Sequence, residues 1–183
     1  RLDHGTLRMI TRFHQHGTLI DTTHLSNFSL ELQGRLETIS DQIRALAGHD
    51  SNPNSSQQVS QYLYHDCGIR PPGGVKKTQS GKDAMDGDVL ASLKPLHPLV
   101  PLVLDYRALD KLDSTYARKL PRLINPHTGR LHTSFRHTNT DTGRLSSDNP
   151  NLQNIPVRTR DGMRIREAFI AGKDQAGRQC VLA

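Results

Sequence analysis

The sequence predicts an α+β fold in which long helices come first and short antiparallel strands follow. Apolar residues recur at spacings of three and four from Leu25 to Leu46, and again from Leu99 to Tyr116. That period is typical of amphipathic helices. After Pro121 the apolar runs become short and are separated by turn residues, which is typical of hairpins. We therefore expect a helical part followed by a sheet.

The first long helix is expected to begin at Asp21 or Thr22 and to run for roughly seven turns. Either residue can cap the helix with a side-chain oxygen, and Gly48 stands where a left-handed residue often ends a helix. Residues 1–20 are assigned to a connector ahead of this helix.

The middle of the chain is expected to alternate loops with short helices. Residues 49–56 are polar and rich in Ser and Pro, and they end in a serine cap for a helix that stops at Gly68. Residues 70–88 contain PPGG and a basic KKT run, and we expect them to form a tip between the two long helices. A short helix over 89–93 follows, and Pro98 opens the second long helix.

Strands are expected after Pro121. Residues 123–135 read as a hairpin around the turn at 126–129, and 165–170 with Val181-Leu182 supply further strands. The chain begins at Arg1 and stops in an apolar run that resembles a strand cut partway. We therefore expect a piece of a longer polypeptide.

Composition favours an anionic partner and excludes several classes. The chain of 183 residues has 24 Lys+Arg against 18 Asp+Glu and a pI of about 9.6. Cys67 and Cys180 do not suggest a disulfide framework, and no apolar stretch reaches the ~18 residues that a membrane span needs. We expect a soluble intracellular chain with no membrane partner. His14 and His16 could chelate a metal, but no Cys or carboxylate cluster accompanies them, so we expect none.

The run from Thr142 to Gly162 is dense in hydroxyl, amide and guanidinium groups. Arg144 follows a glycine, and its planar fork of donors suits phosphates or base edges. The short polar side chains behind it suit sugars, phosphates and groove edges. Alternatively, these side chains satisfy their own backbone, as Asn and Ser do in many turns. Composition alone leaves both readings open.

This run and its flanks, INPHTGRLHTSF over 124–135 and RIREAFIAG over 164–172, resemble the beginning of the palm in family A DNA polymerases, the bacterial DNA polymerase I group. DYRALDKLDSTYARKLP over 105–121 is similar to the base of their thumb, and VKKTQSG over 75–81 to a phosphate contact on it. The resemblance covers nearly the whole chain. It implies two long antiparallel thumb helices within 21–121 and the first strands of a truncated palm over 122–183, from a bacterial or phage source.

The resemblance also implies roles for single residues. Arg144 would lie in the minor groove at the primer end, and the NLQN segment would line template and primer. Arg158 would make a further contact to an anion, or else pair with Asp161. Lys111 could instead pair with Asp110 or Asp113, or face solvent. The expected DNA contacts are Thr142, Arg144, Ser146, Ser147, Asn151, Gln153, Asn154 and Arg158 in the polar run, Arg107, Lys111, Ser114 and Thr115 in the second long helix, and Lys76, Lys77 and Thr78 at the tip.

The sequence departs from the family pattern in three places. Arg136-His137 stands where Asn-Gln is usual, Asp148-Asn149 where Ser-Asp is commoner, and residues 82–85 where Tyr-Ser-Thr is usual. Arg136 would add a phosphate contact, whereas Asp148 brings a charge that a phosphate would repel.

The implied function is primer-template binding within a DNA-directed DNA polymerase of replication or repair. The metal-binding aspartates of the family would follow Ala183, so we expect this segment to bind no cofactor and to be inactive alone. The whole enzyme would use Mg²⁺ and deoxynucleoside triphosphates, act as a monomer, and lie in the cytoplasm near the nucleoid, or in the host cytoplasm if from a phage. The alternatives are a stand-alone, non-catalytic nucleic-acid-binding module and a helical interaction protein with no nucleic-acid role.

Overall fold

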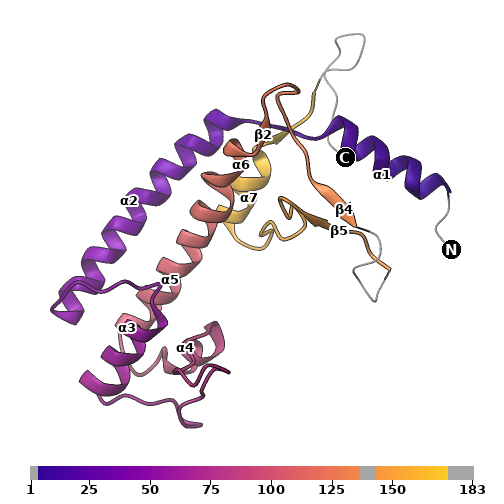
Figure 1. Ribbon diagram of the computed structural model, residues 1–183. Coiled ribbons are helices and arrows are strands. Elements are labelled where there is room, and N and C mark those ends of the chain that lie inside the picture. Colours follow the sequence, from indigo (N-terminus) through magenta and orange to yellow (C-terminus); the bar gives the residue numbers. More distant parts are fainter. Residues whose placement is uncertain (1–3, 137–142, 173–183) are drawn as a thin grey trace. The chain divides into compact units, whose positions relative to one another are not determined.

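The structure is a computed structural model that describes residues 4–136 and 143–172 (Figure 1). The chain forms two compact units. Unit 1 comprises residues 1–30 and 112–183, and unit 2 comprises residues 31–111. Helices and small antiparallel strand pairs both occur, in agreement with the expected α+β class.

Unit 2 is helical. It contains most of α2 (Thr22–Ala47), then α3 (Ser56–Ser60), the π-helical turn η1 (Gln61–Asp66), α4 (Gly87–Leu93) and nearly all of α5 (Leu99–Leu112). Within this unit α2 and α5 run in opposite directions (Figure 1). The unit has one apolar core, made of Ile43, Val59, Leu63, Tyr64, Ala84, Met85, Val89, Leu90, Leu93, Leu99, Val100 and Val103.

The two ends of α2 and the start of α3 lie at the expected capping residues. The amide of His24 donates to Asp21 Oδ1 at 2.9 Å, which caps α2. Gly48 ends that helix with a φ of 75°, a left-handed conformation that favours glycine. Ser55 caps α3 through the Gln58 amide. The predictions of α2, of the serine cap and of a helix opened by Pro98 are confirmed.

Unit 1 combines short helices with three two-stranded antiparallel pairs. Its helices are α1 (His4–His16), the start of α2, the π-helical turn η2 (Asp113–Ala117), α6 (Lys119–Arg122) and α7 (Arg160–Glu167). β1 (Leu19–Ile20) pairs with β6 (Phe169–Ile170), β2 (Ile124–Asn125) with β3 (Arg130–Leu131), and β4 (Ser134–Arg136) with β5 (Ser146–Asp148). Its fully buried side chains include Leu25, Phe28, Leu120, Leu131 and Ile165.

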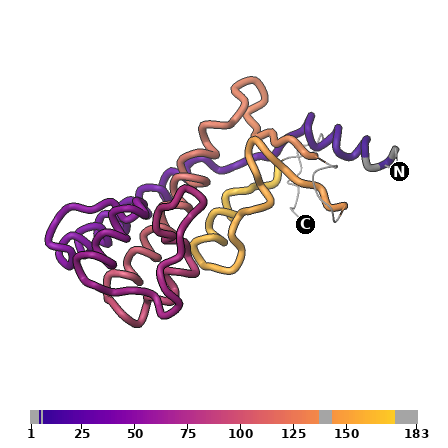
Figure 2. Tube along the Cα trace, turned by 60° about the horizontal axis from the view of Figure 1, so that its bottom comes forward, coloured from indigo at the N-terminus to yellow at the C-terminus, as the bar shows by residue number. Residues whose placement is uncertain are grey.

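The predicted hairpin is confirmed as the β2–β3 pair, which projects as a narrow loop (Figure 2). The predicted strand over 165–170 is mostly wrong. Thr159 caps α7 by accepting from the Gly162 amide at 3.0 Å, and the helix continues to Glu167. Ile165 and Ala168, three residues apart, are both buried, so the apolar spacing there is helical. Val181-Leu182 lies outside the described residues.

Two elements were not expected. Residues 4–16 of the proposed connector form a helix, and residues 146–148 of the polar run form a strand. None of the helices in residues 4–136 and 143–172 combines the length and apolar content that crossing a bilayer requires.

Candidate nucleic-acid interface

The polar run of unit 1 is presented by the β4–β5 pair. Phe135 lies opposite Ser147, and Arg136 lies opposite Ser146, in antiparallel register. Arg144 is exposed just before β5. Thr142, another expected DNA contact, lies outside the described residues.

The segment after β5 is folded onto itself by its own side chains. Asn151 Oδ1 accepts from the amides of Gln153 and Asn154, at 3.0 and 3.2 Å. Ser147 Oγ accepts from the Leu152 amide at 3.0 Å. The Gln153 side chain accepts from the Ser147 amide at 3.1 Å and donates to the Leu145 carbonyl at 2.8 Å. These bonds agree with the alternative interpretation, in which the polar side chains of the run bond to their own backbone.

The structure therefore corrects the role expected of Ser147. Its side chain is only 2% exposed and is held by the loop, so it does not face a ligand. Gln153 is exposed, but both ends of its amide have partners within the chain. Ser147 shapes the loop because a buried polar group must find its hydrogen bonds inside the protein. Gln153 shapes it through the two bonds that its side-chain amide makes to the loop backbone.

Two further hydroxyls anchor the same loop to the rest of unit 1. Tyr116 Oη donates to the Asn154 carbonyl at 2.6 Å. Burial raises the pKa of Tyr116, which keeps its hydroxyl protonated as a donor. Thr133 Oγ1 lies 3.0 Å from the Asp148 carbonyl and 2.7 Å from the Pro150 carbonyl. Sequence reasoning did not identify either anchor, because each links residues at least 15 positions apart.

The groups that remain outward on this loop are cationic or amide-bearing. Arg144, Asn151, Asn154 and Arg158 are exposed, and Ser146 is half-buried. An ordered, internally bonded loop that presents guanidinium and amide groups can bind an anionic backbone with little further ordering.

The turn η2 contains both buried side chains that hold the fold and exposed hydroxyls that face solvent. Ser114 and Thr115 are exposed, as is Lys111 at the end of α5. Asp113 is fully buried; it accepts from Ser29 Oγ at 2.5 Å and forms an ion pair with Arg118 Nε at 2.7 Å. Asp113, one of the two carboxylates suggested as alternative partners for Lys111, is thus engaged elsewhere.

Arg107, another expected DNA contact, is half-buried and has main-chain partners within unit 2. Its Nε donates to the Pro53 carbonyl at 2.8 Å and its Nη1 to the Met85 carbonyl at 2.5 Å. Burial lowers the pKa of the guanidinium. Arg107 therefore ties two loops of unit 2 to α5 through its Nε and Nη1, which donate to main-chain carbonyls.

The basic tip in unit 2 is a small hairpin-like loop. The amide of Ala84 donates to the Lys76 carbonyl, and that of Thr78 to the Lys82 carbonyl, at 2.9 and 2.8 Å. Lys77 Nζ pairs with the Asp83 carboxylate, and Thr78 Oγ1 donates to the Lys82 carbonyl. Lys76 and Lys82 are exposed. The sequence did not single out Lys82, although its place in the tip turn puts it beside the expected residues.

His14, considered and rejected above as a metal ligand, connects two elements of unit 1. Its Nε2 accepts from the Phe135 amide at 2.8 Å, and its ring stacks on that of Phe135 with centroids 5.9 Å apart. Across residues 4–136 and 143–172, no three His, Cys, Asp or Glu side chains are grouped so as to hold a metal ion.

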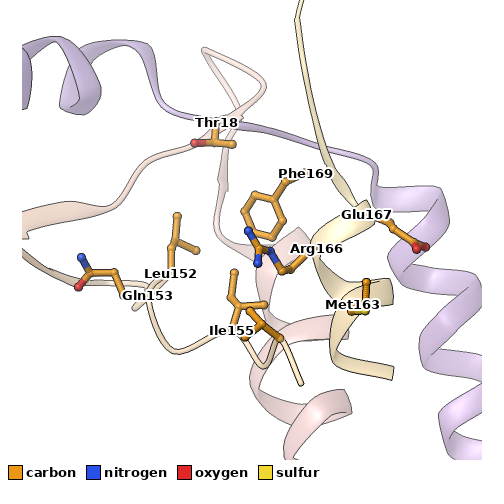
Figure 3. Close-up of a pocket in the computed structure, with 9 residues that line it drawn as sticks. Thr18, Leu152, Gln153, Ile155, Met163, Arg166, Glu167 and Phe169 are labelled. Carbon is orange, nitrogen blue, oxygen red and sulfur yellow. The ribbon is translucent and has the colours of Figure 1, made fainter. Parts of the chain in front are cut away.

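An open hollow of about 740 Å³ lies beside the NLQN segment in unit 1 (Figure 3). Most of its lining is apolar, and Arg166 and Glu167 point in different directions (Figure 3). The lining residues are Thr18, Leu152, Gln153, Ile155, Val157, Met163, Arg166, Glu167 and Phe169. No pair of acid and base converges there, so the hollow does not read as a catalytic centre.

Comparison with known proteins identifies relatives that match most of this chain. The family model described as DNA polymerase family A matches residues 22–181. The thermostable DNA polymerase I of Thermus filiformis is 46% identical over 164 residues, which are 90% of this chain and 19% of that protein. DNA polymerase I of Chloroflexus aurantiacus is 41% identical over 172 residues, 93% of this chain and 18% of that protein.

A solved structure agrees with these relatives. It is described as the POL domain of Pol1 from M. smegmatis in complex with DNA primer-template and dNTP. Its TM-score is 0.79 at 34% identity, over 90% of this chain and 28% of that chain. The chain thus spans about a fifth of the length of the curated relatives it matches.

Proposed function

The chain belongs to DNA polymerase family A, and from that premise we propose that it is the segment that holds the primer-template duplex in a template-directed DNA polymerase. Residues 21–121 would be the thumb, with residues 1–20 leading into it, and residues 122–183 would begin the palm. The relatives are polymerases at 40–48% identity, and the M. smegmatis structure was solved with primer-template DNA and dNTP. The expected DNA and nucleotide partners of this chain rest on that kinship.

The observation that supports the proposal most is the ordered polar loop of unit 1. Ser147 and Gln153 of the loop, together with Tyr116 of η2, hold its backbone, and the exposed side chains of Arg144 and Arg158 offer positive charge. A loop that served only its own backbone would not need outward guanidinium groups. Phosphate contacts from such groups fix register, while minor-groove contacts sense pair shape without reading sequence.

Nucleotide addition is proposed for the whole enzyme and not for this segment. We propose that the whole enzyme uses Mg²⁺ and deoxynucleoside triphosphates, and that this segment alone adds no nucleotides. The contribution of the chain itself is to bind and orient the duplex through Lys76, Lys111, Ser114, Thr115 and the loop of unit 1, each of which is exposed or half-exposed at its outward groups.

Duplex binding can be tested by fluorescence anisotropy with a recessed primer-template, a blunt duplex and a single strand. We expect the 183-residue chain to prefer DNA that contains duplex. Arg144→Ala should weaken binding roughly 5- to 150-fold, because one guanidinium contact to a base edge is worth about 1–3 kcal/mol.

The matched control is Arg44→Ala, which removes an exposed guanidinium from α2 that pairs with Asp41 and Asp50. It should change affinity by less than about twofold. Equal binding of single strand and duplex, or an Arg144→Ala variant that binds as the wild type does, would contradict the proposal. A stand-alone binding module, the alternative, would show the same binding but no extension when fused to the remaining polymerase residues.

A further inference from the structure

Two of the three departures from the family pattern meet each other in the structure. Arg136 ends β4 and Asp148 ends β5, and the two strands are paired. Arg136 Nε lies 2.6 Å from Asp148 Oδ2. The unusual cation and the unusual carboxylate therefore compensate each other across the strand pair.

The pair is accessible and its charges are balanced locally. The side chains of Arg136 and Asp148 are 53% and 41% exposed. Asp148 Oδ1 is buried and has no hydrogen-bond partner among the described residues. Asp148 Oδ2 forms its ion pair with Arg136. Ion pairs at this exposure add little to stability, since solvent and salt screen them. A competing phosphate can therefore displace Asp148 from the guanidinium.

The location is next to the proposed DNA contact. Ser146 lies opposite Arg136, and Arg144 is two residues before Ser146. Two residues span at most about 7 Å. A phosphate near Arg144 is thus within reach of the long Arg136 side chain.

We propose that Asp148 restrains Arg136 as a phosphate-binding residue, so that this ion pair sets how tightly the β4–β5 strand pair holds an anionic backbone. The inference rests on the proposed function. It predicts effects of opposite sign. Removing the charge of Asp148 releases Arg136 to bind phosphate, whereas removing the charge of Arg136 leaves Asp148 to repel it.

The test compares Asp148→Asn, Arg136→Gln and wild type for binding to a recessed primer-template over a salt series. Asp148→Asn should bind about eightfold more tightly at 0.1 M salt, because one added phosphate contact steepens the slope of log affinity against log salt by about 0.9. Arg136→Gln should bind more weakly than wild type. Asp148→Ser, the residue commoner in the family, should act as Asp148→Asn does. Circular dichroism and thermal melting verify that each variant is folded.

The outcomes are separable. If wild type binds and both single variants weaken binding, the pair is only a structural contact and the inference is refuted. If wild type binds and neither variant changes the affinity or the salt slope, the pair does not face DNA, and the inference is again refuted. If folded wild type does not bind duplex, the proposed function fails and the inference fails with it. Should Asp148→Asn misfold, Asp148→Ser decides the sign.

Discussion

Arg107 offers the sharpest distinction between a residue that binds DNA and one that holds the fold. Arg107→Met keeps the length of the side chain but removes its donors. Two hydrogen bonds from a charged donor, to the carbonyls of Pro53 and Met85, are lost. Such bonds contribute about 1.5–3 kcal/mol each. Part of this loss is offset, because the buried guanidinium no longer has to be desolvated and its Nη2 lacks a partner in the described structure.

The expected net loss in the free energy of unfolding is therefore about 2–3 kcal/mol. For a chain of this size that corresponds to a melting temperature lower by about 4–12 °C. Thermal unfolding followed by circular dichroism measures the shift. DNA affinity, measured well below the melting temperature, should change by less than about twofold.

Lys111→Met is the matched control, since it replaces an exposed cation one helical turn further along the same helix. It should leave the melting temperature within about 1–2 °C, because surface substitutions usually cost under about 0.5 kcal/mol. It should lower the salt slope of DNA binding by about 0.9. An Arg107→Met variant that melts as the wild type does but loses DNA affinity would refute this reasoning and restore the role implied by the resemblance.

Three further substitutions test the scaffold of unit 1. Tyr116→Phe removes the donor to the NLQN backbone and should cost about 1–3 kcal/mol in unfolding experiments and weaken DNA binding. Because burial raises the pKa of Tyr116, the stability that its hydroxyl contributes is present below about pH 10 and is lost as pH rises through the folded-state pKa. The free energy of unfolding should therefore fall less between pH 8 and pH 11 in Tyr116→Phe than in the wild type, and an equal fall would contradict this. Gly162→Ala should destabilise by about 1–3 kcal/mol, because a Cβ would lie 2.6 Å from the Pro156 carbonyl oxygen, whereas Gly34→Ala, with open space in α2, should stabilise by up to about 1 kcal/mol; equal melting temperatures would count against the packing described. Ser147→Ala should lower stability by about 1–3 kcal/mol in denaturant unfolding, and an unchanged midpoint would show that its hydroxyl does not hold the loop.

The sequence predicted the elements whose signals are local. The period of three and four along α2 and α5, the caps at Asp21 and Ser55, and the glycine after Ala47 all depend on residues within a few positions of each other. Such patterns can be read without knowing the fold. The same holds for the β2–β3 hairpin, whose turn residues are adjacent.

The direction of side chains at the site could not be predicted in the same way. Whether Arg107 points to a phosphate or to the carbonyls of Pro53 and Met85 depends on loops more than 20 residues away. Ser147 is buried, and its hydroxyl accepts from the amide of Leu152, which the sequence pattern does not reveal. The turn η2 adds a second reason: its π-helical winding differs from the regular helical repeat, so spacing alone did not show that Asp113 turns inward.

The central claim is that the exposed groups of this chain hold duplex DNA, and hydrogen–deuterium exchange with and without a recessed primer-template tests it most directly. The account predicts slower exchange on DNA binding in residues 143–159, 76–82 and 111–115, with little change in residues 49–58 of unit 2, which contain no expected DNA contact. Binding that leaves the exchange of residues 143–159 unchanged, with protection only elsewhere, would contradict the account.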